Sequence, residues 1–132
     1  MKMRFRCGCG NVFNGTEQTT VCPGCGRPLD LNNCGAIQVY RMGNMVGMAV
    51  GMGIYVDEMP FGHLANKESV RLVVPYGTHK LHMTLSTNRN CNDPMITITP
   101  EAPVAFCKAH ISGGFVAKIV IEPANPQDMP PC

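Results

Sequence analysis

The chain has 132 residues, which suits one ordinary domain or a small domain joined to a medium one. It carries 14 Gly, 11 Pro, no Trp and only 15% charged residues, a composition typical of short β-strands separated by turns. The formal net charge is +2, and residues 36–132 carry seven basic and seven acidic side chains. This balance excludes the concentrated basic face of most nucleic-acid binders from that part of the chain.

The N-terminal residues MKMRFRCGCG contain no apolar segment of the kind found in secretory signals. No stretch of the chain reaches the roughly 18 apolar residues that a membrane span needs. We therefore expect a cytoplasmic protein without a membrane span. Thiols stay reduced in the cytoplasm, so cysteine pairs at short spacing indicate a metal site rather than disulfides.

Two such cysteine pairs lie near the N-terminus. Cys7 and Cys9 form a C-x-C pair, and twelve residues further on Cys22 and Cys25 form a C-P-x-C-G turn. Four thiolates at about 2.3 Å from the metal make a closed tetrahedral site that leaves no position for a substrate. We therefore predict that Cys7, Cys9, Cys22 and Cys25 bind one structural Zn²⁺ ion. Cys34 is an alternative to Cys7, because the first pair has one intervening residue where many zinc sites have two.

The segment 1–34 is too short to fold on its own apolar core, so metal binding is expected to supply much of its folding energy. Short strands at 11–14 and 19–21 are predicted to form a hairpin between the two cysteine pairs. The basic residues Lys2, Arg4, Arg6 and Arg27 outnumber the acidic ones by two. Four thiolates with one Zn²⁺ would bring the charge of this segment to zero.

The residues around the cysteines resemble bacterial zinc ribbons. The resemblance rests on residues 5–10 (FRCGCG) and 21–29 (VCPGCGRPL), and it covers about a fifth of the chain. It implies a small metal-stabilised domain at 1–34.

From residue 36 onward the apolar residues alternate with polar ones at a period of two. The extended segments predicted in this way are 37–41, 50–57, 70–74, 81–85, 95–99, 104–111 and 115–121. Turn signals separate them, for example Pro75-Tyr76-Gly77 and Gly113-Gly114. Seven or eight short strands of this kind predict an all-β fold, with an antiparallel β-sandwich over 35–122.

The order of the motifs in this region resembles a bacterial family of PEGA-like β-sandwich domains of unknown function. The residues that carry the resemblance are 39–41 (VYR), 54–58 (IYVDE), 62–68 (GHLANKE) and 74–81 (VPYGTHKL). The resemblance implies surface or scaffold binding rather than a reaction.

The residues suited to acid–base chemistry show no catalytic pattern. Cys107 and His110 lie three residues apart on one predicted strand, which places them on opposite faces, and the same parity separates His79 from His82. Cys91, Cys107 and Cys132 are scattered and are interpreted as thiols that do not bind the metal. We therefore predict that the protein is not an enzyme.

Two segments indicate contacts with other chains. The Met-rich segment 42–52 is interpreted as core packing or an assembly surface rather than a copper site, and residues 123–132 form a Pro-rich arm that cannot be a central strand. We predict a zinc-stabilised binding protein that docks on another protein or forms a homo-oligomer through strand edges and the arm. The alternatives are a ribbon that binds nucleic acid, which the charge balance disfavours, and a zinc–thiol redox switch.

Overall fold

The regular structure consists almost entirely of β-strands. The computed structural model describes residues 2–43, 50–86, 88–113 and 117–132. The elements in these ranges are β1 (Met3–Arg6), β2 (Val12–Gly15), β3 (Cys34–Arg41), β4 (Met52–Val56), β5 (Met59–Leu64), β6 (Ser69–Pro75), β7 (Gly77–Leu85), β8 (Met95–Ile98), β9 (Val104–Ser112), β10 (Lys118–Pro123) and the 3-10 helix η1 (Pro126–Asp128). The prediction of an all-β fold is confirmed. Within the described ranges, no helix is long and apolar enough to cross a membrane.

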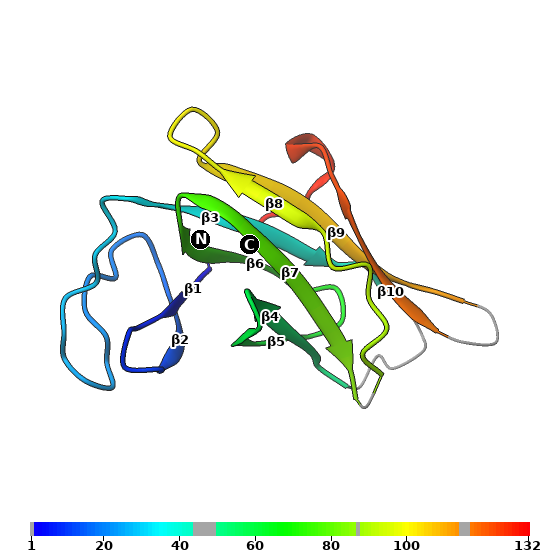
Figure 1. The fold of residues 1–132 in the computed structure, drawn as a ribbon, viewed down its shortest axis with the longest axis horizontal. Helices are drawn as coiled ribbons and strands as arrows, with labels where there is room; N and C mark the ends of the chain where they lie inside the picture. The colour runs from blue at the N-terminus through cyan, green and yellow to red at the C-terminus, as the bar shows by residue number, and fades with distance from the viewer. Residues whose placement is uncertain (1, 44–49, 87, 114–116) are drawn as a thin grey trace.

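The strands form two sheets. One has the strand order β10-β9-β3-β6-β1-β2 and the other has the order β5-β4-β7-β8. The chain crosses between them several times, so that β3, β6 and the β9–β10 pair belong to the first sheet and the intervening strands belong to the second (Figure 1). Most neighbouring strands are antiparallel, as predicted, whereas β3 with β9 and β1 with β6 are parallel. These two pairs join strands that are distant in sequence, where no hairpin fixes the direction.

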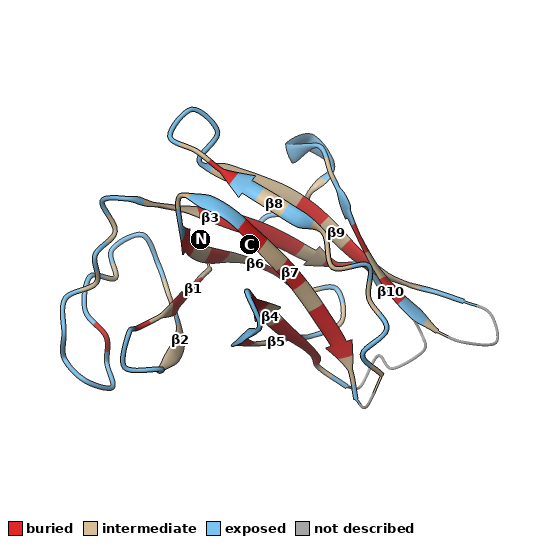
Figure 2. Ribbon diagram, in the orientation of Figure 1, coloured by how far each residue is buried: buried red, intermediate tan, exposed pale blue. Residues whose placement is uncertain are grey.

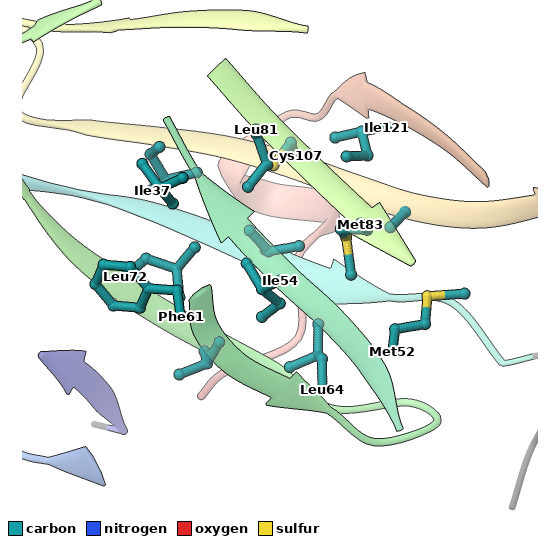
Figure 3. Packing of buried hydrophobic residues seen from close by; sticks show 14 of the residues in the cluster. Ile37, Met52, Ile54, Phe61, Leu64, Leu72, Leu81, Met83, Cys107 and Ile121 are labelled. Carbon is teal, nitrogen blue, oxygen red and sulfur yellow. The ribbon is translucent and has the colours of Figure 1, made fainter. Parts of the chain in front are cut away.

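The core lies between the two sheets. Its members come from the alternating positions of both: Ile37, Val39, Met52, Ile54, Val56, Phe61, Leu64, Val70, Leu72, Val74, Leu81, Met83, Ile98, Cys107, Ala109, Ile119 and Ile121. Figure 3 shows side chains of β4, β5 and β7 directed toward those of β3 and β6. Burial of these apolar side chains is the main force that holds the sheets together.

Three local features differ from the sequence prediction. β5 was not predicted, because Pro60 and Gly62 interrupt the alternation within it. The predicted strand at 19–21 is reduced to one isolated bridge between Val21 and Pro28, so the hairpin predicted between 11–14 and 19–21 is wrong: β2 pairs instead with β1, a strand that the sequence pattern does not predict. The strand predicted at 115–121 begins at Lys118 among the described residues, and residues 115 and 116 lie outside them.

The Met-rich segment is described only at its ends. Residues 44–49, which include Met45 and Met48, lie outside the described ranges. Met52 is buried in the core and Met42 is exposed. The interpretation of core packing therefore holds for Met52.

The C-terminal arm lies against its own chain. The backbone N–H of Ala124 donates to the Phe106 carbonyl at 3.0 Å, and the Gln38 side-chain amide donates to the Pro130 carbonyl at 3.4 Å. Gln38 also accepts a hydrogen bond from Arg71 Nε at 2.7 Å. Its neighbours in β3, Ile37 and Val39, face the core, so Gln38 lies on the opposite face of the sheet. The arm and Arg71 cover it there, and it is buried as well.

The N-terminal hairpin of β1 and β2 is part of the larger sheet. β1 pairs in parallel with β6 through Met3 opposite Arg71 and Arg4 opposite Leu72, and the Phe5 and Phe13 rings stack at 5.5 Å between centroids. The first sheet therefore runs across the boundary predicted at residue 34. The division into a domain at 1–34, a domain at 35–122 and an arm at 123–132 stays a prediction.

Arg4 connects this hairpin to the second sheet. Its guanidinium is buried and donates to Asn14 Oδ1 at 2.9 Å, to the Phe61 carbonyl at 3.3 Å and to the His63 carbonyl at 2.7 Å. Gly62 lies between these two carbonyls with φ of 86°, and a Cβ there would lie 3.0 Å from Arg4 Nη1. The glycine therefore allows both carbonyls to reach one guanidinium.

This geometry predicts that Arg4→Met destabilises the fold by about 2–4 kcal/mol, because two carbonyls of β5 and the Asn14 side chain lose their donor. Arg6→Met is the matched control, since Arg6 makes one long contact of 3.5 Å with the Pro60 carbonyl at the surface, and we expect a change within about 0.5 kcal/mol. Urea unfolding of both variants measures the difference. Equal stability of the two variants would contradict the role given to Arg4.

Candidate metal centre

The first cysteine pair lies in the turn between β1 and β2. The Cys7 backbone N–H donates to the Asn11 carbonyl and the Gly10 N–H donates to the Cys7 carbonyl, both at 2.9 Å. Gly10 has φ of 95°, a left-handed conformation that glycine adopts without strain. The turn therefore places Cys7 and Cys9 side by side at the end of the hairpin.

The second cysteine pair lies in a similar turn. The Cys22 N–H donates to the Arg27 carbonyl at 2.9 Å, and the Gly26 N–H donates to the Cys22 carbonyl at 2.8 Å. Gly26 also has positive φ, at 76°. The bridge between Val21 and Pro28 closes the base of this turn.

The two turns bring four sulfur atoms together. Cys7, Cys9, Cys22 and Cys25 have their Sγ atoms within 4.8 Å of one another, and we call this group the cysteine cluster. Cys7 Sγ lies 3.5 Å from Cys25 Sγ, and Cys9 Sγ lies 3.8 Å from Cys22 Sγ. A tetrahedral ion with metal–sulfur bonds of about 2.3 Å separates its sulfurs by about 3.8 Å, whereas a disulfide requires about 2.0 Å. All four cysteines are free, and their spacing could hold a metal ion.

A polar side chain supports the cluster from outside. Asn11 Nδ2 donates to Cys22 Sγ at 3.6 Å. A Cβ at Gly24 would come within 2.8 Å of the same Asn11 nitrogen, so glycine at this position leaves room for the amide. Hydrogen bonds of this kind orient metal ligands and stabilise the thiolate form.

The two turns also set the acidity of the sulfurs. Burial acts to raise the pKa of the Cys22 thiol, but hydrogen bonds from the Asn11 amide, the Cys25 and Gly24 N–H groups and the Cys25 thiol lower it to about 6. The Cys9 N–H acts to lower the pKa of Cys7, yet burial and the neighbouring thiols raise it to about 11. In the metal-free cluster the Cys22 thiol is therefore more acidic than an ordinary thiol and the Cys7 thiol less acidic.

The remaining cysteines lie elsewhere. Cys34 Sγ donates to the Asp30 carbonyl at 3.4 Å and is not a member of the cluster. Cys107 is in the core, where burial raises its pKa to about 12. Cys132 is half-buried at the C-terminus.

The histidine side chains lie largely on the strand faces that the alternation along each strand predicts. Cys107 faces the core, while His110 on the same strand lies 3.6 Å from Glu122. His79 is held by Asp57 Oδ2 at 2.6 Å and by the Pro75 carbonyl at 2.7 Å.

Sequence reasoning missed one group that could bind a metal. His82, Cys91 and Asp93 present donor atoms within 4.8 Å of one another. His82 is on β7, whereas Cys91 and Asp93 lie in the segment between β7 and β8. The alternation of side chains along a strand therefore says nothing about whether the three lie close together. A histidine near the end of a strand followed by a nearby Cys-x-Asp sequence was the available signal.

No protein-family model, no curated protein and no solved structure matches the chain. The resemblances to zinc ribbons and to PEGA-like domains therefore stay predictions.

The acidity of the cluster predicts how metal affinity depends on pH. Protons compete with the metal for sulfur, and below about pH 6 Cys22 also becomes protonated in the metal-free protein. Affinity for Co²⁺ or Zn²⁺ should fall as the pH drops from 8 to 5, more steeply below about pH 6. A titration of the sulfur-to-cobalt charge-transfer band at several pH values measures this, and an affinity that does not vary with pH would contradict it.

Proposed function

We propose that the cysteine cluster binds one Zn²⁺ ion with a structural role, as in a zinc ribbon. The observation that carries this proposal is the approach of four unbonded sulfurs to within 4.8 Å of one another. Four thiolate donors favour zinc among the common cellular metals. They also fill all four positions of a tetrahedral ion, so no position remains for a substrate.

The segment around the cluster supports a structural role. Among residues 11–33, Cys22 is the only buried residue. Figure 2 shows the same region, the loops that follow β2, mainly in the colours of exposed and intermediate residues. A segment with so little buried apolar surface cannot offset its conformational entropy by packing. Binding of a metal to ligands from both turns would supply that free energy.

We further propose that the protein acts as a non-enzymatic assembly module whose partner is a second copy of this chain. The edge of the smaller sheet favours this interpretation. β8 is an edge strand, and its Met95 is 63% exposed, the highest value among the large apolar side chains of the described residues. An unpaired edge with an apolar side chain can extend its sheet by pairing with another strand.

A hollow of about 220 Å³ beside β8 adds to this edge. It is mainly apolar and is lined by Pro94, Met95, Ile96, Ala105, Phe106, Cys107, Ile121, Glu122 and Pro123. In the proposed dimer this hollow would add apolar surface beside the paired edges. The arm is a weaker candidate for the interface, because Gln38 and Phe106 of the same chain already hold it.

The basic residues near the N-terminus offer little support for a nucleic-acid partner. Arg4 is buried, and Lys2 forms an ion pair with Glu68. Both side chains are therefore engaged within the protein. Of the four basic residues in this segment, only Arg6 and Arg27 remain to contact phosphates.

Substitution of single cysteines tests the zinc proposal. Cys22→Ser should abolish the one zinc equivalent that resists a competing chelator, because serine is a poor zinc ligand. Cys34→Ser is the matched control and should retain that equivalent, since Cys34 lies outside the cluster. Native mass spectrometry counts the metal in both variants. Retention of the tight zinc in Cys22→Ser, or its loss in Cys34→Ser, would overturn the proposed ligand set.

Substitution of Met95 tests the assembly proposal. Met95→Glu places like charges across a β8–β8 contact and should weaken self-association at least about tenfold. The variant should still fold, because Lys80 lies directly opposite Met95 on β7 and pairs favourably with a glutamate. Met59→Glu is the control, as Met59 is 48% exposed on the other edge strand of the same sheet. Sedimentation equilibrium measures both, and a wild-type protein that is monomeric at every concentration would refute the proposal.

A further inference from the structure

The group formed by His82, Cys91 and Asp93 has the composition of a metal site. Each residue is half-buried, and the three donor atoms lie within 4.8 Å of one another. His82 Nδ1 lies 2.5 Å from Asp93 Oδ1. The set therefore contains one nitrogen, one sulfur and one oxygen donor, all of which are ligands that zinc and cobalt accept.

The fold fixes the segment that carries two of these residues. Leu85 and Asn88 exchange backbone hydrogen bonds of 2.9 Å after β7, so the chain turns back beside that strand. The Asn90 carbonyl then accepts the Ile119 N–H at 2.8 Å. The Leu81 N–H donates to the Pro94 carbonyl at 3.0 Å. The segment is therefore held to β7 at both ends and to β10 in between.

Asn92 completes this attachment. Its side chain donates to the Ile121 carbonyl at 2.8 Å and accepts the Ile121 N–H at 2.9 Å. Cys91 precedes it and forms a bridge with Ile119. Asp93 follows with φ of 48°, a left-handed conformation that aspartate tolerates better than most residues. Cys91 and Asp93 are therefore positioned by backbone contacts and not only by contact with His82.

Space for a further ligand is available beside the group. A hollow of about 250 Å³ is lined by Tyr55, Glu58, Lys80, His82, Arg89 and Asp93. A zinc ion bound by three protein side chains keeps a fourth position for water or a small ligand. The lining carries the cations Lys80 and Arg89 as well as the acids Glu58 and Asp93, so it suits a water molecule or a small anion as the fourth ligand of an ion held by the three side chains.

We propose that His82, Cys91 and Asp93 form a second, weaker site for a divalent transition metal, with Zn²⁺ as the physiological ion. Two ligands at about 2.0–2.1 Å in tetrahedral geometry lie about 3.3 Å apart. The contact of 2.5 Å between His82 and Asp93 therefore has to open when the ion enters, and the ion displaces the proton shared by these two residues and the proton of the Cys91 thiol. This rearrangement, together with the single thiolate, makes the site weaker than the cysteine cluster.

Zinc binding to the full-length chain tests this site, with free zinc controlled by a chelator buffer and bound zinc counted by native mass spectrometry. The wild-type protein should bind a second zinc as free zinc rises. Cys91→Ser and His82→Gln should each weaken that second equivalent at least about tenfold and leave the first unchanged. Asp93→Asn should do the same, and it preserves the left-handed backbone because asparagine adopts it readily.

Two control variants distinguish a site from general effects of the substitutions. Cys107→Ser removes a thiol outside the group, and His110→Gln removes a histidine that lies 3.6 Å from Glu122 and belongs to neither group of metal-binding side chains. Both should bind the second zinc as the wild type does, and thermal unfolding confirms that each variant is folded. A wild-type protein that binds no second zinc, or a Cys91→Ser variant that binds it with unchanged affinity, would overturn the proposal. Neither result affects the tight equivalent of the cysteine cluster.

Discussion

The N-terminal part of the structure brings four sulfur atoms within 4.8 Å of one another, a spacing at which four thiolates would repel one another strongly. Cys22 can lose its proton near pH 6, but the pKa of Cys7 rises to about 11 in the same group. Only a bound cation can make the ionisation of all four compatible with this spacing. The two turns that carry the sulfurs have hydrogen bonds of their own, yet almost nothing else in residues 11–33 is buried. The proposed zinc ion would therefore hold together a segment that packing alone does not.

This segment is joined to the rest of the fold through ordinary β-sheet contacts. β1 lies between β2 and β6 in the larger sheet, and the buried Arg4 reaches two carbonyls of β5 in the smaller one. Loss of the proposed metal ion would therefore destabilise residues beyond the two turns, at the end of both sheets. The exposed edge at β8 lies on the opposite side of the smaller sheet from β5, the strand that Arg4 contacts. The candidate metal centre and the proposed assembly surface are thus separate features of one fold.

Much of this arrangement could be predicted from local sequence, and the rest depends on contacts that local sequence does not encode. Alternation located most strands of the core, and the cysteine spacing identified all four members of the cluster. The sequence pattern does not predict β5, because Pro60 and Gly62 interrupt the alternation of apolar and polar residues. Gly62 has a tertiary role that local sequence does not show: the absence of a side chain leaves room for the Arg4 guanidinium. The parallel pairing of β1 with β6 joins residues far apart in the chain. The grouping of His82 with Cys91 and Asp93 requires knowing that the chain turns back after Leu85.

The position of β1 has a consequence for the order in which a newly made chain can fold. Its partner β2 and the four cluster cysteines lie within residues 7–25 and are synthesised soon after β1, whereas its other partner β6 begins at Ser69. During translation one side of β1 therefore remains unpaired until some forty more residues have left the ribosome. Early capture of a metal ion by the cysteines would hold the hairpin together during this interval.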